Sequence, residues 1–408
     1  MRVIVLGGGL LGVASAYYLQ QLGHEVTVID RHGTPAAKVR GLVDTPTPAA
    51  PLPTYRPGTS WRAAFERVRN RVHGWTGYLT GTAHRPTERM EHLARLGAYS
   101  RESVRALGRE AGVTQPSRGA GWMRIYTDAE AFGQFARNVP RLHALGCVMH
   151  LLSADEALRI EPALEPLRGQ LAGAAFTREG TSSDAAGFVG SAIFMCRAAG
   201  VHFLMNHTVT QLHAREGRVD HVELRNADGE RTTLRADAYV MAMGSGSAPV
   251  AQGLGVPLRL RLVHEHAVLL PLKNPSRAPQ VMLQDLHSRL RMQRVTTPDG
   301  DRLRVWTTVR AGSAAAALRD DVRLARMLAR VETLLPGLVD ARGAVLTTTP
   351  YARSANGLPL IGRTRMRNLF LNVAPGAPGW IHACGAGKSI ARIVSGMSPE
   401  VEFAFAKG

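Results

Sequence analysis

The stretch that decides the fold is residues 2–30, RVIVLGGGLLGVASAYYLQQLGHEVTVID. Residues 2–6 are a short apolar run rich in β-branched side chains, which is typical of a buried parallel strand. A glycine-rich turn at residues 7–12 follows at once, then a helical stretch to about Leu22 and a second apolar run at residues 25–29. This order predicts a βαβ unit of the Rossmann type.

The glycines of this turn follow the pattern Gly-x-Gly-x-x-Gly, and each has a physical task. Gly7 permits the tight turn, Gly9 lets a pyrophosphate approach the backbone, and Gly12 lets the helix pack closely on the strand. The helix N-terminus offers free N–H groups and the positive end of its dipole to phosphates. Asp30 ends the second strand, where its carboxylate can accept hydrogen bonds from ribose hydroxyls. We therefore predict a dinucleotide site here, for either FAD or NAD.

Length and composition describe an ordinary globular protein. The chain has 408 residues, enough for two or three domains, with 45% hydrophobic and 20% charged residues. Disordered, fibrous and repeat proteins are therefore excluded. The three cysteines, Cys147, Cys196 and Cys384, have no CxxC spacing, so we expect neither a disulfide framework nor a metal site. The first residues lack a signal-peptide pattern, and no apolar run reaches 18 residues, so we expect a cytoplasmic protein.

The net charge of +18 needs a separate interpretation. Only four of the 50 basic residues are lysines, which leaves 46 arginines scattered along the chain. A coding bias toward arginine and a basic binding surface would both produce this skew. No nucleic-acid-binding module accompanies the charge, so we expect a solvated basic surface and no nucleic-acid partner.

Several later segments carry a family pattern in matching order. They are Glu88-Arg89-Met90, Ala98-Tyr99-Ser100-Arg101, residues 151–158 (LLSADEAL), Glu161-Pro162-Ala163-Leu164, residues 235–240 (RADAYV) with Gly244, and residues 371–387 from Leu371-Asn372 through Gly379-Trp380 to Ala383-Cys384-Gly385-Ala386-Gly387. Together with the N-terminal 31 residues, they make the chain resemble the small subunits of D-amino-acid dehydrogenases. That family belongs to the D-amino-acid oxidase and glycine oxidase superfamily of flavoproteins, and the resemblance covers most of the chain.

The resemblance implies an α/β fold with two domains. One is a Rossmann-type FAD-binding domain with a central parallel sheet, and the other is an α+β substrate domain built on an antiparallel sheet. The FAD domain would be discontinuous and comprise residues 1–47, 88–112, 184–256 and 346–408. The substrate domain would comprise residues 113–183 and 257–345, with 48–87 as a variable connecting segment.

Local patterns agree with this division. A helix is expected at residues 188–199, and strands are expected at 201–205, 237–243, 266–272, 303–309 and 369–373.

The resemblance also implies that the cofactor is FAD, and it adds further residues that would contact the FAD. Val209 falls where the family contacts adenine through its backbone, and Gly244 begins a loop that packs near the FAD. A glycine-containing turn before the last helix would lie under the flavin ring. The full set of predicted cofactor residues is Gly7, Gly9, Leu10, Leu11, Gly12, Asp30, Arg31, Val209, Gly244, Gly376, Ala377, Gly379 and Trp380. Gly385 and Gly387 are instead expected to serve helix packing.

The chain departs from the family at three places near the flavin and substrate. A Thr-Ser and Asn-Ala-Gly segment of the family is replaced by residues 37–44 (AKVRGLVD). The family's Gly-Leu-Arg-Pro run, whose arginine clamps the substrate carboxylate, is replaced within residues 349–359 (TPYARSANGLP), which puts Tyr351 at the arginine's register. A Gly-Tyr pair and a Gly-Gly pair are replaced by Glu265-His266 and Trp306-Thr307.

These departures change the residues that would contact the substrate. Oxidation of an amino acid by a flavin depends on orientation more than on a strong base, so no catalytic side chain is assigned. A bidentate arginine orients a carboxylate far better than a lone tyrosine hydroxyl does. Arg353, two positions after Tyr351, is a candidate clamp if the strand shifts locally, and otherwise a surface arginine. Tyr351 and His266 are further candidate pocket residues, each with a structural role as the alternative.

The resemblance implies an oxidoreductase that deaminates D-amino acids. Hydride leaves the α-carbon for flavin N5, the imino acid is hydrolysed to a keto acid and ammonia, and electrons pass to a respiratory acceptor. Two alternatives stay open: a flavin enzyme with another amine substrate, and a catalytically weakened FAD-binding paralogue. Delivery of electrons to a membrane chain also makes the inner face of the plasma membrane a candidate location for peripheral contact.

Overall fold

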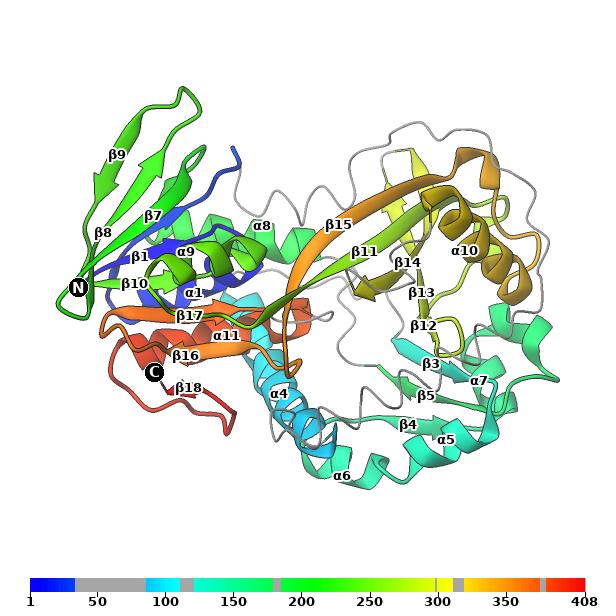
Figure 1. Cartoon of the computed structure of the whole chain (residues 1–408). Coiled ribbons are helices and arrows are strands. Elements are labelled where there is room, and N and C mark those ends of the chain that lie inside the picture. The colour runs from blue at the N-terminus through cyan, green and yellow to red at the C-terminus, as the bar shows by residue number, and fades with distance from the viewer. Residues whose placement is uncertain are drawn as a thin grey trace.

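The computed structural model describes residues 1–33, 86–110, 121–178, 185–297, 299–310, 319–374 and 379–407. The described residues form two lobes, each built around its own large sheet, with the long strands β11 and β15 extending from one lobe toward the other (Figure 1).

The N-terminal βαβ unit forms as the sequence predicts. Strand β1 spans Arg2–Leu6, helix α1 spans Leu10–Gln21 and strand β2 spans Glu25–Ile29. β1 pairs in parallel with β2 on one side and with β10 (Ala238–Met241) on the other, so it lies at the centre of its sheet. A strand in that position is covered on both faces, which explains its continuous apolar run.

The first sheet has seven strands in the order β18-β16-β17-β10-β1-β2-β6. Its outer strands are β6 (His202–Leu204), β16 (Leu360–Arg363), β17 (Leu369–Val373) and β18 (Ala406–Lys407). All neighbours are parallel except β16 and β17. Because side chains alternate along a strand, Val3 and Val5 enter one apolar core while Ile4 and Leu6 enter another on the opposite face.

Helices cover one face of this sheet. They are α1, α4 (Pro86–Glu110), α8 (Ala185–Ala198) and α11 (Gly379–Val394). The close approach of α11 depends on small residues, since a Cβ on Gly387 would lie 2.7 Å from the carbonyl carbon of Ala14 in α1. The helix-packing role predicted for Gly385 and Gly387 is confirmed, because Gly385 meets Ser100 of α4 in the same way.

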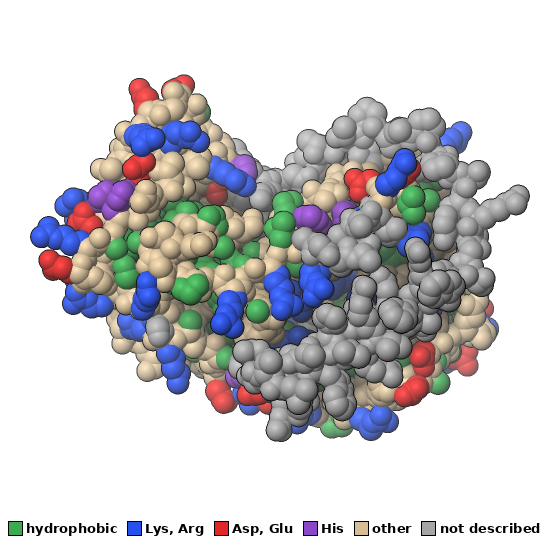
Figure 2. All heavy atoms as spheres, viewed as in Figure 1, with side chains coloured by type: hydrophobic (Ala, Val, Ile, Leu, Met, Phe, Trp, Pro, Cys, Tyr) green, Lys and Arg blue, Asp and Glu red, His purple; other side chains and the backbone are tan. Residues whose placement is uncertain are grey.

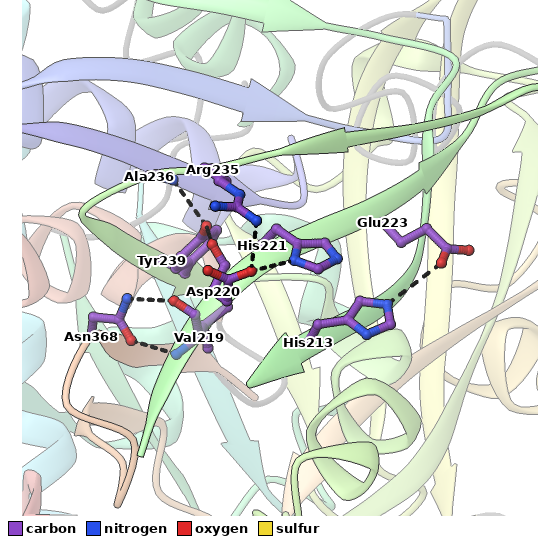
Figure 3. Close-up of polar contacts among 9 residues, drawn as sticks. All are labelled: His213, Val219, Asp220, His221, Glu223, Arg235, Ala236, Tyr239 and Asn368. Carbon is purple, nitrogen blue, oxygen red and sulfur yellow. Dashed lines mark hydrogen bonds and ion pairs between the residues drawn. The ribbon is translucent and has the colours of Figure 1, made fainter. Parts of the chain in front are cut away.

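The other face carries helix α9 (Ser247–Gly253) and a three-stranded sheet made of β7 (Thr208–Arg215), β8 (Arg218–Arg225) and β9 (Arg231–Leu234). Polar contacts attach this small sheet to the large one (Figure 3). Asn368 accepts a 2.8 Å hydrogen bond from the Val219 backbone N–H and donates a 2.9 Å bond to the Val219 carbonyl. The Tyr239 hydroxyl accepts from the N–H of Ala236 and donates to the carbonyl of Asp220.

The second sheet has eight strands in the order β15-β11-β14-β13-β12-β3-β5-β4. Their bounds are β3 Trp122–Tyr126, β4 His150–Leu152, β5 Gly173–Thr177, β11 Leu260–Pro271, β12 Met282–Asp285, β13 Leu290–Thr297, β14 Gly300–Arg310 and β15 Val345–Ser354. Every neighbouring pair is antiparallel except β12 and β3. That parallel pair joins the two stretches of sequence from which the sheet is assembled.

One face of the eight-stranded sheet is apolar and packs against helices. These are α7 (Ala154–Ile160), the 3-10 helix η1 (Pro162–Leu167) and α10 (Asp320–Leu334), with Leu158, Leu164 and Leu324 in the shared core. Helices α5 (Ala129–Ala136) and α6 (Val139–Ala144) follow β3, and short 3-10 turns occur at η2 (Gly244–Gly246), η3 (Pro275–Arg277) and η4 (Ala341–Gly343).

Strand β15 refines the expected domain boundary. It falls in the range 346–408 that we expected in the FAD domain, yet it pairs with β11 along its length, from Val345 opposite Leu269 to Ser354 opposite Leu260. This pairing commits the strand to the eight-stranded sheet. We therefore propose that the FAD domain resumes only after Ser354.

Candidate cofactor and substrate site

Two glycines of the N-terminal turn are required by close packing. Gly7 has a φ of +107°, and a Cβ there would lie 2.6 Å from the carbonyl oxygen of Ala242. A Cβ on Gly12 would lie 1.7 Å from the carbonyl oxygen of Gly7. Any side chain at either position would push the helix or β10 away from β1, so these glycines hold the turn in shape.

Gly9 is different, because no described residue occupies the space that its side chain would fill. No heavy atom of the described residues lies within 4 Å of an added Cβ, and its φ of −72° suits any residue. Gly9 is also the N-cap of α1, with no side-chain cap on the helix N–H groups. Open space beside uncapped N–H groups fits a pyrophosphate, which would accept hydrogen bonds from the first turn at Leu10 and Leu11.

The Asp30 carboxylate stands at the end of β2 and is held over the turn. Its Oδ2 accepts a 2.7 Å hydrogen bond from the backbone N–H of Gly8. Its Oδ1 accepts a 2.8 Å bond from the N–H of His32 and lies 2.7 Å from His32 Nδ1. Oδ2, with one bond, keeps a further lone pair for a ribose hydroxyl. His32 therefore orients the Asp30 carboxylate. This role was not predicted from the sequence, because the predicted residues of this segment end at Arg31.

The remaining predicted cofactor residues gather at the same edge of the seven-stranded sheet. Because β6, β2, β1, β10 and β17 are parallel neighbours, their carboxyl ends share one edge. Arg31 is an exposed residue just after β2, Val209 lies in β7 shortly after β6, and Gly244 begins η2 after β10 with a φ of +58°. Gly379 and Trp380 begin α11 after β17.

Some predictions lie outside the described residues. Gly376, Ala377 and the divergent segment 37–44 fall there, as do the side-chain surroundings of Trp380. The described part of this edge fits FAD: Gly9 and the N-terminus of α1 would hold the pyrophosphate, and Asp30 the adenosine ribose.

The second sheet approaches this edge, because η2 packs against β15. The face of the sheet opposite the apolar core is polar, and we call it the polar face. Its central residues, which follow from the strand registers, are Trp122, Arg124, Glu265, Gln284, Arg291, Arg304, Trp306, Thr308 and Tyr351. Figure 2 shows Lys and Arg side chains gathered where the two lobes meet.

Tyr351 lies on the polar face and interacts with its neighbours there. Its hydroxyl hydrogen-bonds Thr308 of β14, and burial raises its pKa, so the phenol stays protonated near neutral pH. Glu265 and Arg304 form an ion pair on the same face, with 2.6 Å between the carboxylate Oε1 and Nη2. Arg304 also stacks on Trp306, 4.5 Å from its ring centroid.

Two of the departures from the family lie next to each other in the fold, on the paired strands β11 and β14. His266 stands opposite Thr307 across the β11–β14 pair, and the neighbouring Ala267 stands opposite Trp306. The replacements at 265–266 and 306–307 therefore face each other, although about forty residues separate them in sequence. Side chains that face each other across two strands pack together, so a change of side-chain size in one strand is accommodated by a change in the other.

His266 lies on the opposite face from Tyr351, which corrects its prediction as a pocket residue. It stands between Glu265 and Ala267 of the polar face, so its own side chain points into the apolar side of the sheet. The side chain is 3% exposed, and its Nδ1 lies 2.9 Å from Thr348 Oγ1. Burial, followed by the charge of Arg323, lowers the His266 pKa to about 4. It is a neutral core histidine.

Arg353 lies on the same side of β15 as Tyr351, but at the edge of the polar face. It is exposed, and its Nη2 lies 3.1 Å from the position that a Cβ on Gly357 would take. Nη1 of Arg89, from α4, lies 3.3 Å from the same position. Burial and the charge of Arg353 both lower the pKa of Arg89. The structure thus brings Arg353 beside a second guanidinium and not into the centre of the sheet.

Comparison with known proteins places these features in context. A family model described as FAD dependent oxidoreductase matches residues 2–393. A D-amino acid dehydrogenase of Methylobacterium nodulans is 30% identical over 98% of this chain and 97% of its own. One of Dechloromonas aromatica is 31% identical over 99% of both chains.

Solved structures share the fold at lower identity. The L-proline dehydrogenase of P. horikoshii superimposes with a TM-score of 0.71 at 17% identity, covering 97% of this chain and 94% of that one. The glycine oxidase of Geobacillus kaustophilus gives a TM-score of 0.68 at 18% identity, covering 99% and 97%. The predicted two-part α/β architecture is therefore confirmed.

Proposed function

Because the chain belongs to the family of FAD-dependent oxidoreductases and acts on amino acids, we propose that its substrates are D-amino acids and that it deaminates them oxidatively. The observation that carries this proposal is the polar face, which brings guanidinium groups toward the edge where Gly9 and Asp30 would hold FAD. A cationic wall beside that edge suits a substrate that carries a carboxylate.

FAD supplies the chemistry of the step, since its N5 accepts the hydride that leaves the α-carbon. The nitrogen loses a proton, and water then converts the imino acid to a keto acid and ammonia. The protein's own task is to hold the carboxylate so that the α-carbon is correctly placed, which needs donors but no strong base. Neutral Tyr351 can donate such a hydrogen bond, and the Glu265–Arg304 pair fixes the wall beside it. The electrons then pass to a respiratory acceptor.

Anaerobic bleaching of the bound flavin by a panel of D- and L-amino acids tests this proposal. We expect several D-amino acids to bleach the flavin and their L-enantiomers to leave it oxidised. Re-oxidation by a quinone analogue but not by oxygen would support the respiratory acceptor. Stoichiometric FAD that no D-amino acid bleaches would contradict the proposal.

The role of Arg353 can be separated in the same assay. Its position at the edge of the polar face predicts that Arg353→Ala changes the rate of bleaching by D-alanine only weakly. A loss of about a hundredfold or more, the value of a bidentate carboxylate contact, would instead make Arg353 the clamp.

Tyr351 favours a second candidate function, the oxidation of an amine whose carboxylate is held in a different geometry. A tyrosine at the register of the family's arginine removes the usual clamp from β15. Bleaching by secondary amines and by achiral amines, but by no D-amino acid, would favour that candidate.

A further inference from the structure

The polar face holds more positive charge than its own acidic residues balance. In the described strands β3 and β11–β15, Glu265 is the one carboxylate that the register places on this face, and it is paired with Arg304. Arg124 and Arg291 lie on the same face, and among the described residues no carboxylate lies within 4.0 Å of either guanidinium. Both side chains are half-buried.

Burying Arg291 has a cost for the protein. Burial lowers the pKa of Arg291. The Tyr351 phenol and the Glu265 carboxylate raise this pKa, and the charges of Arg124 and Arg304 lower it. A guanidinium stays protonated even so, because its ordinary pKa lies far above neutrality. A half-buried cation that no carboxylate contacts directly is destabilising, and a bound anion would remove that cost.

Arg124 is held in place by aromatic rings. Its guanidinium carbon lies 5.0 Å from the ring centroids of both Trp122 and Phe135. Stacking occupies the faces of a guanidinium and leaves its N–H edge available for a carboxylate. The Arg124 side chain also interacts with the Tyr126 hydroxyl. Its Nε is buried and has no hydrogen-bond partner among the described residues.

Further unmade hydrogen bonds adjoin the two arginines. The indole Nε1 of Trp122 and the side-chain oxygen of Gln284 are buried, and neither has a hydrogen-bond partner in the part of the chain that the structure describes. Gln284 of β12 stands directly between the arginines, opposite Arg291 on one side and Arg124 on the other. Buried polar groups without partners are rare in native proteins. Trp122 Nε1 and Arg124 Nε are donors that a carboxylate can satisfy, and the Gln284 oxygen is an acceptor that the amino group of a substrate can satisfy, so the cluster indicates a ligand with both groups.

The spacing of the arginines fits two anionic groups of one small molecule. One strand separates β13 from β3, so the two backbone positions lie about 10 Å apart. Long side chains reaching inward from that distance can each grip one end of a short dicarboxylate.

We propose that the polar face binds a substrate with two carboxylates, Arg291 holding one beside Tyr351 and Arg124 holding the other beside Trp122 and Gln284. The preferred substrate is thus a D-amino acid with an acidic side chain. This inference rests on the proposed function for its reaction, but the binding site itself does not.

Binding of an unreactive dicarboxylate to the FAD-loaded enzyme tests the site directly. Glutarate has no amino group and cannot be oxidised, and pentanoate has the same number of carbons with a single carboxylate. We expect calorimetry to show glutarate binding about ten- to hundredfold tighter than pentanoate, as one extra charge-assisted contact predicts. Arg124→Gln should abolish the preference for glutarate, and Arg291→Gln should weaken the binding of both glutarate and pentanoate.

A matched control is available on the same strand as Arg291. Arg294 is exposed, points to the other face and is paired with Asp301, so Arg294→Gln removes one positive charge without touching the polar face. We expect it to leave the glutarate preference unchanged. FAD content and melting temperature establish that each variant is folded. If Arg124→Gln does not fold, Gln284→Leu provides a second test, because it removes the side-chain amide N–H donor between the arginines and should weaken the preference for glutarate.

Turnover separates failure of this inference from failure of the proposed function. Anaerobic bleaching by D-glutamate should be about ten- to hundredfold faster than by its neutral isostere D-glutamine at low concentration. Equal bleaching by the two, with equal binding of glutarate and pentanoate, overturns the inference and leaves D-amino-acid oxidation standing. Arg124-dependent glutarate binding without bleaching by any D-amino acid overturns the reaction and leaves the two-carboxylate site standing.

Discussion

At the scale of single residues, Gly9 and Gly12 separate cofactor binding from folding. Gly9→Ala places a methyl group where no atom of the described chain lies within 4 Å, in the space assigned to the pyrophosphate. We expect the apoprotein to lose less than about 1 kcal/mol of stability, mainly from a poorer N-cap. FAD affinity, measured by titration of the apoprotein, should fall by about tenfold or more because the phosphate can no longer reach the helix N–H groups.

Gly12→Ala is the contrasting change at the same turn. Its methyl group would overlap the carbonyl oxygen of Gly7, so we expect loss of the folded apoprotein, seen by circular dichroism. If Gly9→Ala bound FAD as tightly as the parent protein, the space above Gly9 would not hold the pyrophosphate.

His266 makes stability depend on pH. Its pKa is about 4 in the folded protein, below the ordinary 6.5, so between these values the unfolded chain binds a proton that the folded chain does not. The free energy of unfolding should be fully present above pH 6.5 and decline as the pH falls toward 4, by on the order of 1 kcal/mol per pH unit. Urea unfolding at pH 7.5 and 5.0 measures this.

His266→Asn keeps a hydrogen-bonding side chain beside Thr348 but cannot titrate in this range, so it should lose less stability between the two pH values than the parent does. The exposed His150 provides the control, since His150→Gln should lose as much as the parent. A His266 variant whose pH dependence matched that of the parent would remove His266 as the source.

At the scale of helices, α1 and α11 approach each other at Gly387. Gly387→Ala gains up to about 1 kcal/mol of helix propensity, but its methyl group would lie 2.7 Å from the backbone of Ala14. Overpacking of this kind costs about 1–3 kcal/mol or more, so we expect a lower melting temperature. Gly133→Ala in α5 is the control, because nothing lies within 4 Å of its added Cβ and the propensity gain should raise the melting temperature. Stabilisation by Gly387→Ala would contradict the packing role.

Strands whose signal is local could be predicted from the sequence. The runs at residues 2–6, 25–29 and 369–373 coincide with β1, β2 and β17, because a strand buried on both faces is an apolar run whatever its neighbours are. The strands of the second sheet were predicted in part, within β11 and β14, but their order was not. The pairing of β12 with β3 joins segments about 160 residues apart, which no local pattern encodes.

The same limit explains which site residues were found. Asp30 and the glycines belong to one contiguous βαβ unit, so their spacing alone places them together. His266 was misplaced because strand faces alternate residue by residue, and a shift of one position moves a side chain to the other side of the sheet. Arg124 and Arg291 were missed as a pair, since only the β13-β12-β3 register brings them to one face.

At the scale of the whole molecule, the charge of +18 exceeds what the site can use. Arg124, Arg291 and Arg304 on the polar face and a few contacts to phosphate account for a small part of it. Many others are exposed and paired with acids, such as Arg168 with Glu165 and Arg342 with Asp340. The excess must therefore lie on the surface, where Figure 2 shows basic side chains spread over the viewed face. Among the described residues, no helix is long and apolar enough to span a membrane.

A surface of this kind, together with the proposed delivery of electrons to a respiratory acceptor, predicts peripheral binding to anionic membranes. Each basic residue near such a surface contributes about 1 kcal/mol, and the attraction is screened within about 10 Å at 0.1 M salt. We therefore expect co-sedimentation with phosphatidylglycerol vesicles in low salt, release as salt is raised, and no co-sedimentation with phosphatidylcholine vesicles. Equal retention on duplex DNA would show a general polyanion effect. Failure to bind the anionic vesicles at all would make the arginine excess a matter of composition, because a charge that attracts no membrane in low salt cannot hold the protein on one at cellular ionic strength.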